Sequence, residues 1–259
     1  MNAAATSAET ARSRLRTYEA RELSLFGAGT EALTGGVGRS LGRLIGPHHL
    51  KRALESADEA AALLVGSGDH DTDDLDACDG AARRVQAFAQ TSSATTGLTA
   101  GVFGAAGMTA DFVATLTLAA RTVRATAVCY GFTDGDTREE RVFRLLVLEA
   151  ATVTHASGRD DVLARLRAMV LSLETPEAPL RPEDLDWIGE KAADRVARQV
   201  AFALAGRSIG RWVPLAGGLF GAVVNASFQS DVARAARYAN RLRWLGAREG
   251  HRLAGPGAA

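Results

Sequence analysis

Residues 91–110 read TSSATTGLTAGVFGAAGMTA, a run of small and apolar side chains that contains no charge. Residues 212–230 form a second uncharged run, which is again rich in glycine and alanine. Of the 259 residues in the chain, 47% are hydrophobic but only 6% are aromatic, and Ala, Leu and Val dominate the hydrophobic set. This mixture favours helices packed through small side chains over a strand-rich core. The sequence therefore predicts an all-α protein, a single compact multi-helix bundle with two Gly/Ala-rich helical hairpin segments.

The glycines of the two runs are spaced for close helix contact. Glycine inside a helix costs roughly 1 kcal/mol relative to alanine, so its repeated use needs a compensating contact. Gly97 and Gly101 are four residues apart, as are Gly217 and Gly221, and this spacing places each pair on one helix face where backbones can approach. Asn225 extends the second face by one turn. Two interpretations remain open: a tight hairpin buried in the bundle, or a surface in contact with a membrane.

Local signals predict several helix boundaries. Asp111 is of a residue type preferred at a helix N-cap, and the helix that follows it is expected to end at Tyr130, with Gly131 at the usual C-terminal position. Residues 136–139 read DTRE and have the form of a capping box, so we expect the next helix to begin there with Asp136 as its cap. Pro182 suits the first turn of a later helix.

The length of the chain and the spread of these signals indicate one domain over residues 18–250. Residues 1–17 lack the basic start and the apolar middle of a secretory signal, and we expect them to form a disordered tail. Residues 251–259 are expected to form a second disordered tail. Residues 69–79 are rich in aspartate and predict an acidic loop, with a long helix beginning near its end.

Charge and cysteine content argue against several functional classes. Thirty basic residues balance thirty acidic ones, so the chain lacks the basic surface expected of a nucleic-acid-binding protein. Cys78 and Cys129 are far apart and indicate neither a disulfide framework nor a zinc cluster, which fits a reducing cytoplasm. The acidic segment begins like a calcium-binding loop, but Asp74 stands where glycine is needed and Gly80 where glutamate is needed. No HExxH or GxSxG pattern occurs, so no metal, cofactor or hydrolase site is predicted.

The last predicted helix carries a basic stripe that consists of Arg234, Arg237, Arg241 and Arg248. We interpret this stripe either as an ordinary solvated helix face or as a surface that attaches reversibly to an anionic membrane. Neither uncharged run favours a full membrane span, because Thr, Ser, Gly, Asn and Gln dilute its apolar residues.

The two runs and the helices that flank them resemble the EcsC family of bacterial proteins. The resemblance covers roughly residues 50–248 and rests on a Gly-rich turn, on polar residues of the next helix and on a proline and glycine series near the C-terminus. These residues are Gly97, Gly101 and Gly104, then Asp111, Arg121, Arg124 and Tyr130 with Gly131, and finally Pro214, Gly217, Gly221, Asn225 and Phe228. Family members often have proline directly after the aspartate, where this chain has Phe112. The family is helical and is named after a protein encoded beside an ABC transporter, so the resemblance implies a fold but no chemical activity.

Three functions remain as alternatives at this point. The first is a non-enzymatic protein that associates peripherally with the inner face of the cytoplasmic membrane, or with a membrane transport complex. The second is an enzyme of unknown reaction whose site lies around Asp111, Arg121 and Arg124. The third is a soluble helical scaffold. The first is the function that we expect, and nothing in the sequence predicts the oligomeric state.

Overall fold

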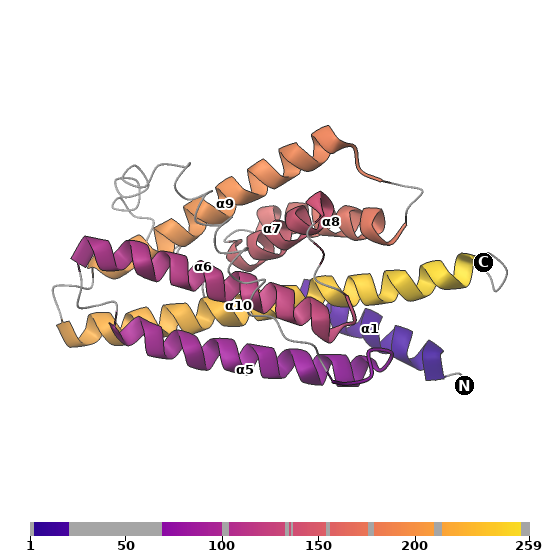
Figure 1. Cartoon of the computed structure of the whole chain (residues 1–259), viewed down its shortest axis with the longest axis horizontal. Coiled ribbons are helices and arrows are strands. Elements are labelled where there is room, and N and C mark those ends of the chain that lie inside the picture. Colours follow the sequence, from indigo (N-terminus) through magenta and orange to yellow (C-terminus); the bar gives the residue numbers. More distant parts are fainter. Residues whose placement is uncertain are drawn as a thin grey trace.

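The computed structural model describes residues 3–20, 69–99, 104–132, 135, 137–153, 156–175, 179–209 and 214–254. Within these ranges the side chains are described except at residues 3–5, 93–112, 156–157, 201–225 and 250–254, where only the backbone is. Seven helices form this part of the chain: α1 (Ala3–Glu19), α5 (Leu75–Thr99), α6 (Gly104–Cys129), α7 (Arg138–Thr152), α8 (Ala156–Glu174), α9 (Pro182–Ile209) and α10 (Pro214–Ala254) (Figure 1). No strand occurs in the described ranges, which confirms the predicted all-α class.

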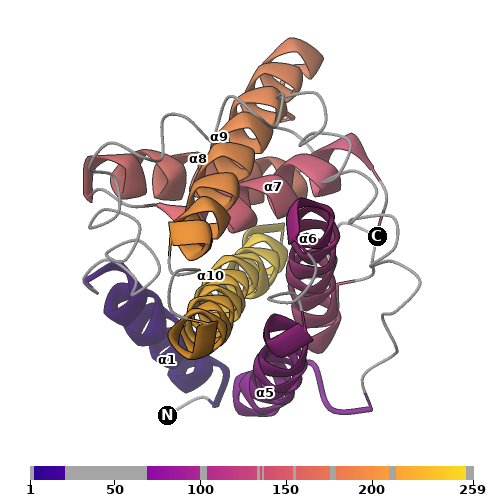
Figure 2. The ribbon, with the colours of Figure 1, turned by 90° about the vertical axis from the view of Figure 1, so that its left-hand side faces the viewer.

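Helix α10 is the axis of the bundle. It has 41 residues and contacts each of the other six described helices. At the usual rise per residue it is about 60 Å long. Helices α5 and α6 run along one side of it, with α5 antiparallel and α6 parallel to α10 (Figure 1). Helices α7, α8 and α9 cover another side, and α1 lies against α10 (Figure 2).

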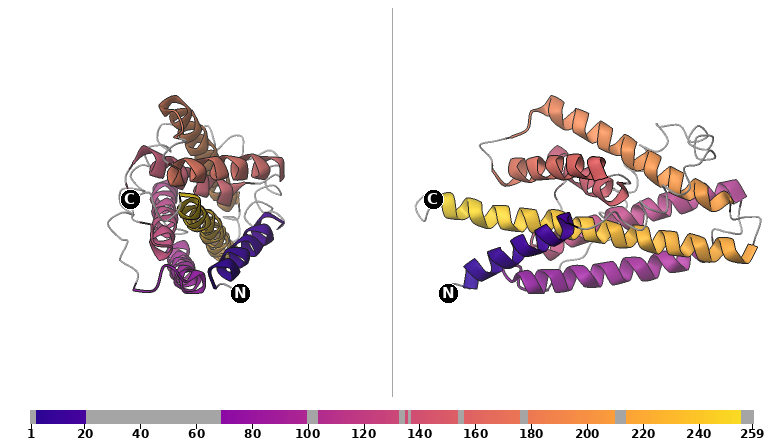
Figure 3. Two further views of the ribbon diagram at one scale, coloured as in Figure 1. Left: turned by 90° about the vertical axis from the view of Figure 1, so that its right-hand side faces the viewer. Right: turned by 180° about the vertical axis from the view of Figure 1, so that it is seen from behind.

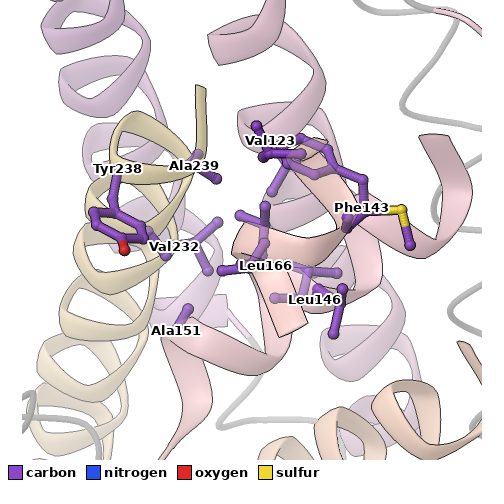
Figure 4. Close-up of a cluster of buried hydrophobic side chains, with 14 of the residues drawn as sticks. Val123, Phe143, Leu146, Ala151, Leu166, Val232, Tyr238 and Ala239 are labelled. Carbon is purple, nitrogen blue, oxygen red and sulfur yellow. The ribbon is translucent and has the colours of Figure 1, made fainter. Parts of the chain in front are cut away.

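The hydrophobic core lies where α6, α7 and α8 meet α10 (Figure 4). Small and branched side chains of α10, such as Val232 and Ala239, take part in this core, and small side chains let helices approach each other closely. Each of the labelled side chains is at most 2% exposed, and they are Val123, Phe143, Leu146, Ala151, Leu166, Val232, Tyr238 and Ala239. The core thus combines small side chains with a few aromatic rings.

Several helix boundaries agree with the sequence signals. Pro182 is the first residue of α9, as its fixed backbone and missing N–H predict. Gly131 follows the end of α6 with a φ of 83°, a conformation that favours glycine. The cap of α7 is Thr137, whose hydroxyl accepts a hydrogen bond from the Glu140 backbone N–H at 3.2 Å. The prediction of Asp136 as this cap was therefore wrong by one residue, because the capping pattern runs from Thr137 to Glu140.

Two predicted boundaries are corrected near the first small-residue run. Helix α6 begins at Gly104, so Asp111 lies two turns inside the helix and is not its cap. The sequence GAAGMTA before Asp111 is helical because alanine is a strong helix former, and the helix preference of the alanines offsets the cost of the two glycines. Helix α5 begins at Leu75, so Asp76 and Asp79 belong to a helix and not to the predicted acidic loop.

The chain ends also differ from the expected tails. Residues 3–19 form α1, and its buried side chains Ala8, Ala11 and Leu15 belong to the core cluster. The prediction of a disordered tail over residues 1–17 was wrong, because a short stripe spaced by three and four residues is enough to pack an alanine-rich helix against α10. Helix α10 continues to Ala254, and residues 255–259 lie outside the described residues.

Candidate functional site

Four helix ends lie together at one end of the bundle. They are the C-terminal ends of α5 and α9, at Thr99 and Ile209, and the N-terminal ends of α6 and α10, at Gly104 and Pro214 (Figures 1 and 3). Each of the two uncharged runs therefore belongs to a helical hairpin, and both hairpins turn at this same end. We call this region the small-residue end.

Charged residues are sparse along α5, α6 and α10 near this end, whereas α9 carries Arg207 two residues before its own end. The last charge of α5 is Arg84, and the first charge of α10 is Asp231. Along the helix axes these residues lie about 22 Å from Thr99 and about 25 Å from Pro214, respectively. In α6 the only charge before Arg121 is Asp111. The small-residue end is thus a zone poor in charge, roughly 20 Å deep along α5 and α10.

The glycine residues singled out in the sequence belong mostly to this zone. Gly97 lies in the last turn of α5, Gly104 begins α6, and Pro214 begins α10. Gly217, Gly221 and Asn225 follow within the first three turns or so of α10, while Gly101 lies outside the described residues. All of these positions except Gly101 are therefore helical.

Below this zone a polar contact joins α10 to α6. Phe228 is 1% exposed in the core. The next residue, Gln229, is completely buried, and its side-chain amide donates to the Thr115 carbonyl at 3.1 Å. This contact fixes α10 against α6 within about four turns of both helix starts.

The proposed enzyme site around Asp111, Arg121 and Arg124 does not converge in the structure. All three residues lie on the single helix α6, and Asp111 is ten residues before Arg121. Ten residues of helix span about 15 Å, which exceeds the reach of an aspartate and an arginine toward each other. The Arg121 guanidinium instead lies over the Phe88 ring of α5, with Cζ 4.3 Å from the ring centroid. Arg124 is buried, with 3% of its surface exposed.

An ionic cluster forms around Asp79 on α5, a residue that sequence reasoning had assigned to a loop. Asp79 is 1% exposed and accepts two hydrogen bonds from Arg241 of α10, from Nε at 2.9 Å and from Nη2 at 2.8 Å. Arg14 of α1 donates to the same carboxylate at 2.5 Å, and the Tyr130 hydroxyl at the end of α6 donates to it as well. One carboxylate thus joins four separate segments of the bundle.

The protonation states in this cluster follow from its contacts. Burial would raise the pKa of Asp79, but the hydrogen bonds and charge of Arg241, with help from Tyr130 and Arg14, outweigh burial and hold the pKa below its usual value. Burial and the negative charge of Asp79 raise the pKa of Tyr130. Asp79 is therefore ionised at neutral pH, and Tyr130 remains a protonated hydrogen-bond donor.

The basic stripe of α10 is engaged with the rest of the bundle. Arg241 binds Asp79, and Arg237 donates to the Gln86 side-chain oxygen. Arg234 donates to Ser230 at 2.7 Å and to Asp231 on its own helix. This placement differs from the solvated or membrane-facing stripe expected from the sequence, because the partners come from α5 and from α10 itself.

The fourth arginine of the stripe, Arg248, binds the segment before α5. It donates to the Thr72 carbonyl at 3.0 Å and to the Asp73 carboxylate at 2.6 Å, and it stacks on Trp244. The indole N–H of Trp244 donates to the same Thr72 carbonyl at 3.0 Å. The acidic segment thus serves to dock α5 on α10.

Carboxylates of the acidic segment accept hydrogen bonds from backbone N–H groups nearby in the chain. The Asp71 carboxylate accepts from the Asp73 backbone N–H at 2.9 Å, and the Asp74 carboxylate accepts from the Asp76 N–H at 2.8 Å, which caps α5. In the part of the chain that the structure describes, no group of three or more His, Cys, Asp or Glu residues is placed to hold a metal ion.

The profile of the EcsC protein family matches residues 11–245, from within α1 to the last turns of α10. The chain belongs to the EcsC family. No match was found among curated proteins or among solved structures. The small-residue end and the Asp79 cluster of this EcsC protein both lie inside the matched region, and the match also includes part of α1, which the resemblance from residue 50 onward had left out.

Proposed function

We propose that this EcsC protein is a non-enzymatic protein that attaches peripherally to the inner face of the cytoplasmic membrane through its small-residue end. The observation that carries the proposal is the convergence of two uncharged runs, about a hundred residues apart in the chain, on one end of the bundle (Figure 3). A shared apolar contact with lipid would use this convergence.

The composition of the small-residue end suits the boundary between lipid headgroups and acyl chains. Apolar residues in the two runs include Phe103 and Phe220, and the second run begins with Trp212, a residue type enriched at membrane surfaces. Arg207 and Arg211 precede Trp212 in the sequence and would add positive charge where anionic headgroups lie. Each such arginine contributes about 1 kcal/mol of attraction to an anionic surface.

In this proposal the protein enters the membrane surface only to a shallow depth. Among the described residues, no helix has the length and the apolar composition to cross a membrane. Interfacial elements bury an apolar face only about 5–10 Å deep. The charge-poor zone of α5 and α10 exceeds this depth, so its outer part would contact lipid while its inner part packs between the helices.

The geometry weakens the enzyme alternative but does not separate the other two from membrane attachment. An enzyme site around Asp111, Arg121 and Arg124 would need side chains that meet, and these lie spread along one helix. A soluble scaffold would share every contact described above and differ only in its affinity for lipid. Association with a membrane transport complex would use the same end with a protein partner.

Flotation of the purified chain with protein-free vesicles tests the proposal. We expect the chain to float with vesicles that contain phosphatidylglycerol, and to do so less at high salt because screening weakens the arginine contribution. The test variants are Arg207→Glu and Arg211→Glu, which reverse charge near the small-residue end. The matched control is Arg181→Glu, because Arg181 precedes α9 at its other end and is exposed.

Loss of flotation in the two test variants, with normal flotation of the control, would support the proposal. A wild-type chain that stays at the bottom of the gradient at low salt would refute direct lipid binding. If that chain still sedimented with native membranes, a membrane protein complex would be the better assignment. Equal loss in test and control variants would show only a nonspecific charge effect and would also count against the small-residue end.

A further inference from the structure

Helix α1 lies at the edge of the bundle, beside α10 (Figures 2 and 3). Within residues 6–19 of this helix, the buried apolar side chains are those of Ala8, Ala11 and Leu15. Helix α7 is two residues shorter and buries nine of its residues. Because burial of apolar surface is the main favourable contribution to packing, α1 is attached to the bundle less firmly than α7.

Ion pairs with α5 and α10 supplement this small apolar interface. Arg14 donates to the carboxylates of Asp79 and Asp76 on α5, at 2.5 Å in each case. Arg12 forms an ion pair with Glu249 of α10. Apart from Asp79, each of these side chains is at least 31% exposed. Exposed ion pairs contribute little to stability and are screened by salt, so this part of the attachment is weak.

The C-terminal end of α1 is fastened to α8 and α10. The Glu19 carboxylate accepts a hydrogen bond from Arg167 of α8 at 2.6 Å and another from the Tyr238 hydroxyl of α10 at 2.7 Å. The ring of Tyr18 stacks on that of Tyr238, with the centroids 4.5 Å apart. Arg159 of α8 lies over the Tyr18 ring and donates to the Tyr18 carbonyl at 2.5 Å. Arginine and tyrosine side chains thus make the described connections at this end.

The remaining helices have a core that does not need α1. The side chains labelled in Figure 4 come from α6, α7, α8 and α10, and α1 contributes none of them. Asp79 also has contacts with Arg241 and Tyr130, which are independent of Arg14. Departure of α1 would therefore leave these contacts in place.

We propose that α1 is a detachable helix, which leaves the surface of α10 and returns to it while the rest of the bundle stays folded. Elements with few buried apolar contacts open locally, without global unfolding. A helix of this length is marginally stable on its own in water, so α1 loses its helical hydrogen bonds when it leaves. Its release exposes the Tyr238 ring and the Asp79 carboxylate. High salt favours the released state, because it screens the ion pairs that hold α1.

This inference does not depend on the membrane attachment proposed above. The contacts of α1 with α10 involve Tyr238 and Glu249, whereas the small-residue end begins at Pro214. The part of α10 between Pro214 and Tyr238 is about 36 Å long. Either proposal can therefore fail without the other.

Hydrogen exchange of the full chain, followed by mass spectrometry, tests the inference. We expect the backbone amides in the interior of α1 to exchange through a local opening. Their exchange should therefore be faster than that of the α7 amides, which are protected until the core opens. A higher salt concentration should speed exchange in α1 and leave exchange in α7 unchanged.

Two variants weaken the attachment of α1 at different points. Arg14→Gln removes the contact with the buried Asp79 carboxylate and should speed exchange in α1 by about tenfold, because a hydrogen bond between charged groups is lost. Arg167→Gln removes a partner of Glu19 and should speed exchange by about threefold, because this ion pair is partly exposed. Arg167→Gln also leaves the sequence of α1 and the Asp79 cluster intact, so it decides the question if Arg14→Gln folds poorly.

Arg16→Gln is the matched control, because Arg16 lies on α1 but pairs with Glu9 of the same helix. It should change exchange in α1 by less than about twofold. The inference would be overturned if α1 exchanged as slowly as α7 at every salt concentration. It would also be overturned if salt and Arg14→Gln sped exchange in both helices equally, because α1 would then open only with the whole bundle. An effect of the control as large as that of Arg14→Gln would likewise count against it, because helix stability and not docking would then determine exchange.

Discussion

Replacement of Asp79 by asparagine probes the central ionic cluster. The substitution keeps the size of the side chain but removes its charge, and one of its two oxygens becomes an NH2 group that cannot accept the hydrogen bonds from Arg241 and Arg14. Removing one partner of a buried ion pair costs about 3–5 kcal/mol. Arg14 keeps its contact with Asp76 at 2.5 Å and is partly exposed, so it can reorient. We therefore expect a loss near the lower limit, about 3 kcal/mol in the free energy of unfolding.

The effect of Asp79→Asn should depend on pH. Because contacts in the folded state lower the pKa of Asp79, its contribution to stability is present above the unfolded pKa, about 4, and is lost as pH falls through the folded pKa. Urea denaturation curves at neutral pH and at a series of acidic pH values would measure this. The difference between wild type and variant should shrink on acidification.

Asp186→Asn serves as the control for this experiment. Asp186 is exposed and pairs with Arg138 at the surface, so its loss should change the free energy of unfolding by less than about 1 kcal/mol. A destabilisation of Asp79→Asn no larger than that of the control would refute the role assigned to the cluster. A difference from wild type that stayed constant down to low pH would show that the charge of Asp79 is not its source.

Three further predictions concern local features of the fold. Gly131→Ala should cost about 2 kcal/mol by urea denaturation, because φ is 83° and the new Cβ would stand 3.0 Å from that of Thr72; an unchanged midpoint would contradict the turn geometry. Thr137→Ala should cost about 1 kcal/mol in the same assay, since it removes the N-cap of α7, and Thr137→Ser should restore most of it. Burial raises the pKa of Cys78 to about 12 and that of Cys129 to about 11, so both thiols should resist iodoacetamide at pH 8 until the chain is unfolded. Mass spectrometry would detect labelling of the native chain, which would contradict this burial.

Local chemistry explains which parts of the fold could be predicted from the sequence. Pro182 and Gly131 mark helix boundaries through their own backbone preferences, which do not depend on the rest of the molecule. The cap of α7 was misplaced by one residue because Asp136 and Thr137 are both suitable cap residues. Asp111 was misread for a related reason: it has the right chemistry for a cap, but helix formation over the preceding alanines extends α6 past it.

Tertiary contacts explain what could not be predicted. Asp79 follows a run of aspartates and looks like part of a solvated loop, and nothing near it in sequence indicates that Arg14 and Arg241 will bind it. A weak signal does exist, because Asp79, Arg83 and Gln86 share one face of α5 at helical spacing. The turning of both uncharged runs at one end of the bundle likewise depends on how α5, α6, α9 and α10 are arranged, which no local pattern determines.

The polar contacts between α5 and α10 have a consequence for the distant small-residue end. Buried alanines occur on both helices, such as Ala82 of α5 and Ala236 of α10, and surfaces of small side chains define the axial position of two helices poorly. Directional contacts define it better, and they recur along the pair: Thr72 with Trp244, Asp79 with Arg241, and Gln86 with Ser230.

A slip of one helical turn, about 5.4 Å, would break all three of these contacts at once. It would also displace Thr99 relative to Pro214 by the same amount, so the two hairpins would no longer end at the same level. Buried ion pairs contribute little net stability compared with well-packed apolar groups, and their best-attested role is to specify register. The Asp79 cluster is therefore best understood as the element that holds α5 and α10 in the register on which a shared small-residue end depends.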